Sequence, residues 1–110
     1  MPGFLWMTVI KKVADSGPCV IVGRCADHIL RERDDLVNVF ICASVDFRVQ
    51  RSIDIDMLPQ ARAVEIVLKK DKKRSGYYKY HVGERWDNVL NYDLAIRSDL
   101  SGIDGTVNCL

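Results

Sequence analysis

One short stretch, residues 19–27, limits what this chain can fold into more than any other part of the sequence. It begins with an uninterrupted apolar run, Cys-Val-Ile-Val, which lies between Pro18 and Gly23. Apolar runs of this length without polar alternation are typical of strands buried on both faces, as in parallel sheets covered by helices. We therefore predict a buried strand at 19–23 and an α/β fold around it.

The residues that follow this predicted strand suit the binding of a phosphate. Ligands of α/β sheets bind beside the carboxyl ends of the strands, and Gly23 and Arg24 occupy that position here. Glycine permits a sharp turn or a close approach of the backbone to a ligand, and the planar guanidinium group of arginine matches a phosphate. An equally open interpretation is a strand end at which Arg24 and Asp27 form a surface ion pair.

Helices and strands alternate along the rest of the chain. Two further apolar segments predict strands at 37–43 and 92–96. Strands separated by helices imply right-handed parallel crossovers. We expect one domain, 1–110, with a parallel sheet of about three strands flanked by helices. The predicted helices, in which apolar residues recur at intervals of three and four, are 4–16, 25–32, one that begins after Ser44, 60–80 and a last one from 101.

The composition favours a packed protein in the cytoplasm. Hydrophobic residues make up 48% of the 110 residues, which is enough to build a core. The formal net charge is +1, so the chain as a whole does not attract nucleic acid or a membrane surface. The four cysteines form no C-x-x-C pair and lack the spacing of metal ligands, which indicates free thiols in a reducing compartment. No apolar segment is long enough to span a membrane.

A basic cluster lies in the longest predicted helix. Residues 69–74 contain five cations around Asp71, and Lys70 and Arg74 lie one turn apart. Asp71 falls on the apolar stripe of this helix, where an acid needs a partner or a changed protonation state. Pairing with Lys70 or Arg74 would meet that need. One interpretation of the cluster is a phosphate clamp, and the other is a solvated helix face.

Arg48 and Arg51 are a further candidate for phosphate binding, because residues three apart share one side of a helix. No Ser-His-Asp or Cys-His set can be assigned, and nothing near either histidine makes a Cys/His metal set. We therefore assign no catalytic residue and no metal ligand. Trp86 is interpreted as a packing anchor rather than a platform for a base. The phosphate-binding loop motif G-x-x-x-x-G-K-[ST] does not occur in the 110 residues.

Several of these segments, taken in order, resemble the cytidylate kinase-like family of P-loop nucleoside monophosphate kinases. The resemblance covers roughly residues 18–104, and the ordered set carries it rather than any single motif. The matching segments are 19–27 with Ile29 and Leu30, 39–43 with Arg48 and Arg51, Lys-Asp-Lys-Lys-Arg at 70–74 with Tyr-Tyr-Lys-Tyr at 77–80, Gly83-x-x-Trp86, and Asn-Tyr-Asp-Leu at 91–94.

The resemblance implies a reaction and its substrates. Members of the family transfer a phosphoryl group from ATP, with Mg²⁺, to a nucleoside monophosphate, typically CMP. Such chemistry needs positioning and cations more than covalent groups. By analogy, Arg24 contacts the acceptor phosphate, and Asp27 lies in the same acceptor-side loop.

The same resemblance assigns roles on the two later helices. Arg48 and Arg51 look like the lid arginines that close on the phosphates. Asp71 and Arg74 match the family's D-x-x-R element at the lid and acceptor side. Lys70, one turn before Arg74, completes the predicted phosphate-binding set.

The resemblance also implies a missing part. The family begins with a strand and a Gly-rich phosphate loop before the counterpart of Phe4, and that strand lies between the counterparts of 19–23 and 37–43. We therefore expect a truncated, C-terminal portion of an NMP-kinase-like sandwich, without its central strand and inactive by itself. Open strand edges favour a homo-oligomer or a strand-swapped dimer. The alternative function is a non-catalytic nucleotide- or phosphate-binding module, and nucleic-acid binding through 69–74 ranks last.

Overall fold

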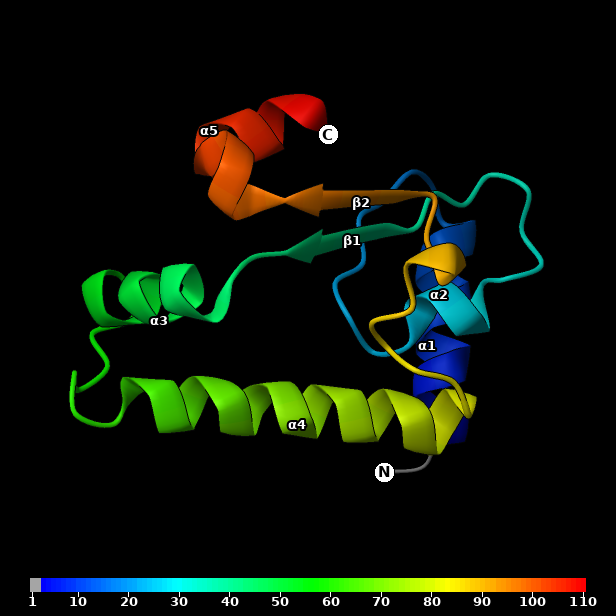
Figure 1. The fold of residues 1–110 in the computed structure, drawn as a ribbon. Coiled ribbons are helices and arrows are strands. Elements are labelled where there is room, and N and C mark those ends of the chain that lie inside the picture. Colours follow the sequence, from blue (N-terminus) through cyan, green and yellow to red (C-terminus); the bar gives the residue numbers. More distant parts are fainter. Residues whose placement is uncertain (1–2) are drawn as a thin grey trace.

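Helices surround a small sheet in the computed structural model, which describes residues 3–110 and the side chains from Trp6 onward (Figure 1). The predicted order of helices and strands is found, with one exception at 19–23. The elements are α1 (Gly3–Asp15), α2 (Ala26–Ile29), β1 (Val39–Cys42), α3 (Val45–Asp54), α4 (Ala63–Val82), the 3₁₀ turn η1 (Val89–Asn91), β2 (Leu94–Arg97) and α5 (Ser98–Cys109).

The sheet consists of β1 and β2, which pair in parallel with Val39 opposite Leu94. Helices α3 and α4 lie on one side of this pair and α5 on the other, so the α/β layering follows the prediction (Figure 1). A carboxylate closes each end of the pair. Asp93 accepts a hydrogen bond from the backbone N–H of Asn38 at 2.7 Å, and Asp99 accepts one from Ser44 at 3.0 Å. The two aspartates fix the register of the strands.

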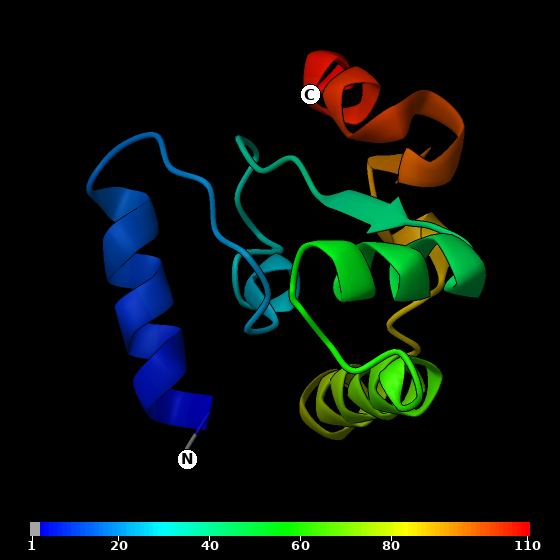
Figure 2. The same cartoon turned by 90° about the vertical axis from the view of Figure 1, so that its left-hand side faces the viewer.

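The predicted strand at 19–23 is wrong for the chain as the structure describes it. Residues 19–22 have no strand partner, and the side chains of Val20 and Val22 are 91% and 88% exposed. The segment passes between α1 and the sheet (Figure 2). It pairs with neither β1 nor β2, and Ile21 packs against a buried cluster of α1 and α2 residues. A strand exists only where a neighbour accepts and donates its backbone hydrogen bonds, and no described residue does so here. The sheet therefore has two strands rather than about three.

Local chemistry sets the ends of the two central helices. The Ser44 hydroxyl accepts a hydrogen bond from the backbone N–H of Phe47 and caps the start of α3. Helix α4 runs two residues beyond the predicted end and stops at Gly83, whose φ of 83° suits the left-handed turn that follows a helix. In α5, Gly102 has a φ of 72° and breaks the helix into two parts.

The core is small and much apolar surface remains exposed. Its buried cluster joins α1 to α2 through Ile10, Ala14, Ala26 and Leu30. The accessible surface is 8388 Å², whereas a compact protein of 12.5 kDa exposes about 6,200 Å². The radius of gyration is 15.5 Å, against about 13 Å for a compact chain of this length. In residues 3–110, no helix combines the length and the apolar character needed to cross a membrane.

Candidate functional site

The inner face of α4 carries the residues that organise the candidate site. Ala63, Val67, Asp71 and Tyr78 recur at intervals of four or seven residues, which places them on one face of the helix. Ala63, Val67 and Tyr78 are buried, and the Asp71 side chain is only 23% exposed. Asp71 is thus an acid at an apolar position, as the sequence predicts, and it needs a partner.

The partner of Asp71 is Arg48, from the first turn of α3. Arg48 Nη1 donates to both carboxylate oxygens of Asp71 at 2.7 Å, and its Nε donates to the carbonyl oxygen of Ala43 at 3.1 Å. The expected pairing of Asp71 with Lys70 or Arg74 is wrong. Helix α3 lies along the first half of α4 (Figure 1), and Arg48 reaches Asp71 on the inner face from there. Adjacent residues of one helix, such as Lys70 and Asp71, do not face each other.

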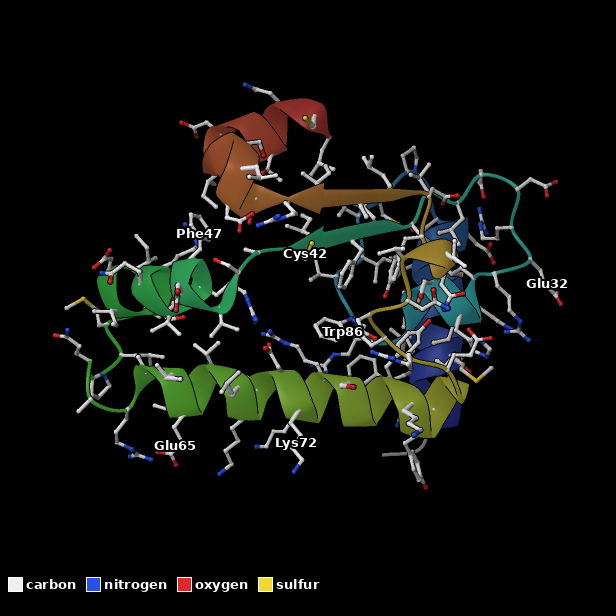
Figure 3. The ribbon with its side chains drawn as sticks, viewed as in Figure 1. Glu32, Cys42, Phe47, Glu65, Lys72 and Trp86 are labelled. Carbon is white, nitrogen blue, oxygen red and sulfur yellow. The ribbon has the colours of Figure 1, made fainter. Side chains whose placement is uncertain are left out.

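A cavity of about 530 Å³ opens beside this ion pair. Volumes of this size are typical of small-molecule sites. Figure 3 shows Trp86 in the space between the sheet and α4. The residues that line the cavity come from β1 and the segment after it, from α3, from α4 and from the loop after α4, and they include Phe40, Arg48, Asp71, Arg74, Trp86 and Asp87.

Aromatic side chains form one wall of the cavity. Phe40 stacks on Tyr92 with 4.9 Å between ring centroids, and Trp86 meets Phe40 edge to face at 5.5 Å. Trp86 therefore packs as an anchor, as the sequence predicts, and it also lines the cavity. The Tyr92 hydroxyl donates to the Trp86 carbonyl oxygen at 2.7 Å. Burial, with the nearby Asp27 carboxylate, raises the pKa of Tyr92 to about 12, so its hydroxyl stays a donor at neutral pH.

The charges around the cavity leave a net positive site. The charge of Asp71 is compensated by Arg48, and that of Asp87 by Arg85, whose Nη2 lies 2.9 Å from Oδ2 of Asp87. The hydrogen bond from Arg85 lowers the pKa of Asp87 below its usual value. Arg74 forms no hydrogen bond or ion pair with any described residue, and Nη2 of Arg48 also lacks one. Lys72 borders the cavity, but its side chain leaves α4 on the side away from the sheet (Figure 3).

Arg24 and Asp27 lie outside this cavity and do not pair with each other. The Arg24 guanidinium carbon lies 5.1 Å from the centre of the Trp6 ring on α1, and Asp27 accepts a hydrogen bond from the Tyr78 hydroxyl at 2.8 Å. The surface ion pair considered for Arg24 and Asp27 is therefore wrong. Burial and the bond to Asp27 raise the pKa of Tyr78 well above its usual value.

Two other predicted residues lie apart from the cavity as well. Arg51 lines a second recess of about 300 Å³ between β1, α3 and α5, and Phe47 leaves α3 on the side that faces α5 (Figure 3). Lys70 is exposed and lines neither cavity. Of the predicted set, the structure brings Arg48, Asp71 and Arg74 together.

The predicted phosphate-binding set did not include Phe40, which lines the cavity, or Tyr78, which binds Asp27. Tyr78 gives a signal in the sequence, because it lies seven residues after Asp71 on the same helical face. Phe40 gives none, since a phenylalanine inside an apolar strand looks like any core residue.

The described residues do not fit a site for Mg²⁺ and the phosphates of ATP. Among residues 3–110, no three His, Cys, Asp or Glu side chains lie close enough together to hold a metal ion. The sequence also lacks the loop motif whose backbone N–H groups and lysine bind the donor phosphates. We therefore assign neither ATP nor Mg²⁺ to any of the described residues.

Comparison with known proteins identifies the family. The model of the cytidylate kinase-like family matches residues 4–100. The chain belongs to this family. Among solved structures, the cytidylate kinase-like chain is similar to the crystal structure of an uncharacterized protein from Eubacterium ventriosum, with a TM-score of 0.80 and 27% sequence identity. That match covers 86% of this chain and 54% of the other, so the chain spans about half of its relative's length. No curated protein matches.

Proposed function

We propose that this chain forms the acceptor-side, phosphate-binding part of a nucleoside monophosphate kinase. The observation that carries the proposal is the unpaired Arg74 beside the Arg48–Asp71 ion pair, at the edge of a cavity with an aromatic wall. In this reaction the terminal phosphoryl group of ATP passes to a phosphate oxygen of CMP, and the bond to ADP breaks. Membership of a kinase-like family supports this reaction class.

The geometry supports different roles for Asp71, Arg48 and Arg74 in binding a phosphate. Asp71 holds Nη1 of Arg48 and leaves Nη2 available to a ligand phosphate, while Arg74 supplies a second, uncompensated guanidinium group. Guanidinium groups bind phosphate oxygens through parallel, charge-assisted hydrogen bonds. The base of the nucleotide would lie against Phe40 and Trp86, which offer an apolar surface of suitable size.

The residues around the cavity are proposed to bind the acceptor CMP, and none of them is assigned to the donor ATP. We propose that the chain by itself binds CMP without turnover, because the 110 residues contain no G-x-x-x-x-G-K-[ST] motif to bind the donor phosphates. The absence of the loop motif also favours the alternative function, a binding module that holds a nucleotide without transferring phosphate. Four free cysteines support a reducing, cytoplasmic setting for either function.

Titration of CMP tests the site. We expect Arg74→Ala to weaken binding about tenfold, the loss of one charge-assisted contact. Lys73→Ala is the matched control, because it removes the same charge from an adjacent, exposed position that does not line the cavity. Equal effects of the two variants, or no binding of CMP by the wild type, would overturn the proposed site.

An assay of ATP-dependent CMP phosphorylation tests the division between binding and transfer. We expect CMP to bind and no CDP to form when the purified 110-residue chain is incubated with ATP and Mg²⁺. CDP formation above background would refute the proposal that the chain alone is inactive.

We further propose that the chain forms a dimer through the open edge of β1 and residues 19–22 of a second copy. The exposed surface exceeds that of a compact protein by about 2,200 Å², and a standard interface needs about 800 Å² per partner. The edge carries no charge that would prevent pairing, since Val39–Cys42 and 19–22 are all uncharged.

Sedimentation equilibrium tests the dimer. We expect Val22→Lys to give a monomer and Leu90→Lys to leave the dimer intact, because both side chains are 88% exposed and only Val22 lies at the proposed interface. A wild-type monomer, or a dimer that survives Val22→Lys, would contradict the proposal.

A further inference from the structure

Tyr78 connects two parts of the molecule that the sequence separates widely. Its ring is buried on the inner face of α4, and its hydroxyl donates to Oδ2 of Asp27, 51 residues earlier, at 2.8 Å. In the part of the chain that the structure describes, no other hydrogen bond or ion pair joins residues 23–30 to α4. Tyr78 lies four residues after Arg74, which is about 6 Å along the helix axis. The bond therefore attaches the turn that carries Arg24 close to the cavity.

The turn that Tyr78 attaches has an unfavourable backbone conformation. Gly23, Arg24 and Cys25 have φ values of 72°, 60° and 57°, so three successive residues are left-handed, and two of them have a side chain. Such conformations persist only where the surrounding structure holds them. The buried Cys25 and Ala26 provide part of that support, as does the backbone hydrogen bond from Ala26 to the Gly23 carbonyl oxygen, and the bond from Tyr78 to Asp27 ties the turn to α4.

We propose that Tyr78 is a positioning residue, whose hydrogen bond to Asp27 holds the turn so that Arg24 can reach the phosphate bound by Arg48 and Arg74. This inference rests on the proposed function. Arg24 is exposed, its guanidinium group lies over the Trp6 ring, and it forms no hydrogen bond or ion pair with a described residue, so its long side chain can leave the Trp6 ring without movement of the turn. Burial keeps the Tyr78 hydroxyl protonated and hence a donor at neutral pH.

A double-mutant cycle on CMP affinity tests the coupling of Tyr78 and Arg24. We expect Tyr78→Phe to weaken CMP binding about fivefold, the loss of one hydrogen bond, and Arg24→Ala to weaken it about tenfold. The double variant should bind no more weakly than Arg24→Ala, since Tyr78 acts through Arg24. A purely structural role would make the two effects multiply. Tyr80→Phe is the control with no expected effect, because that side chain is 85% exposed on the same helix.

Two further measurements separate the possible failures. If Tyr78→Phe does not fold, Asp27→Ala replaces it in the cycle, because it removes the acceptor of the same hydrogen bond and leaves the buried Tyr78 ring unchanged. Hydrogen exchange of the backbone amides of 24–30 tests the positioning without ligand, and we expect faster exchange in Tyr78→Phe but not in Tyr80→Phe. Wild-type CMP binding that depends on Arg74, together with multiplying effects or unchanged exchange, would overturn the role of Tyr78 alone. A wild type that does not bind CMP would overturn the proposed function and this role with it.

Discussion

Arg48 and Asp71 face each other across two helices, with one guanidinium nitrogen 2.7 Å from both carboxylate oxygens. The same arginine donates to the carbonyl oxygen of Ala43, just after β1. One side chain thus joins the sheet, α3 and α4 at the mouth of the cavity. The pair is partly buried, because the two side chains are 32% and 23% exposed.

We expect this ion pair to stabilise the fold measurably. A double-mutant cycle with Arg48→Gln and Asp71→Asn, followed by urea unfolding, should give a coupling of about 1–2 kcal/mol, between the values typical of surface and of buried pairs. The exposed pair of Arg85 and Asp87 is the control, and its coupling should be clearly smaller. Equal coupling in both cycles would mean that α3 and α4 pack without help from Asp71.

Asp99 should make the protein lose stability in acid. The hydrogen bond from Arg97, helped by the backbone N–H of Ser44, lowers the pKa of Asp99 to about 2, from 3.8. Because the folded pKa is depressed, this contribution is complete above about pH 4 and is lost as the pH falls towards 2. Urea midpoints measured between pH 5 and pH 2 should fall more steeply for the wild type than for Asp99→Asn.

The matched control for the acid series is Asp104→Asn, in the same helix at an exposed position. Asp104 forms no ion pair with a described residue, so its variant should keep the slope of the wild type. A slope unchanged in Asp99→Asn would show that other carboxylates account for the acid sensitivity.

Met57 offers a stabilising substitution. It lies in the loop between α3 and α4, and its φ of 59° is a strained conformation for a residue with a side chain. Its side chain is 81% exposed, so packing of the side chain does not offset this strain. We expect Met57→Gly to raise stability by about 1 kcal/mol, or the melting temperature by about 4–8 °C. Met57→Ala keeps the strained conformation and should bring no gain. A lower melting temperature of the glycine variant would contradict the assignment of strain.

Much of the fold could be predicted from the sequence, because the helices have clear periodicity and two strands coincide with apolar segments. The Asp71 position was informative for the same reason, since an acid on an apolar stripe requires a buried partner. The identity of that partner could not be predicted, because Arg48 reaches Asp71 only through the packing of α3 on α4. From spacing along the helix, the candidate partners of Asp71 were Lys70 and Arg74.

The error at 19–23 has a different physical origin. An apolar run indicates that a segment can be buried. Whether it forms a strand depends on a neighbouring strand elsewhere in the fold, and the residues of the run do not reveal whether that neighbour exists. Arg24 shows the same limit. The sequence shows that Arg24 follows an apolar run. Its contact with Trp6 could not be predicted, because that contact depends on how α1 packs beside the turn.

The carboxylates of Asp93 and Asp99 at the ends of the β1–β2 pair have a consequence for folding. The residues that they join are 55 positions apart in the sequence, so pairing of the strands must close a long loop that contains α3 and α4. Loop closure of this kind carries an entropic cost that local helix contacts do not. We expect the two helices to form and pack first, and the strands to join last. When the strands pair in this last step, the hydrogen bonds of the two aspartates favour the native register of β1 and β2 over a pairing shifted along the strands.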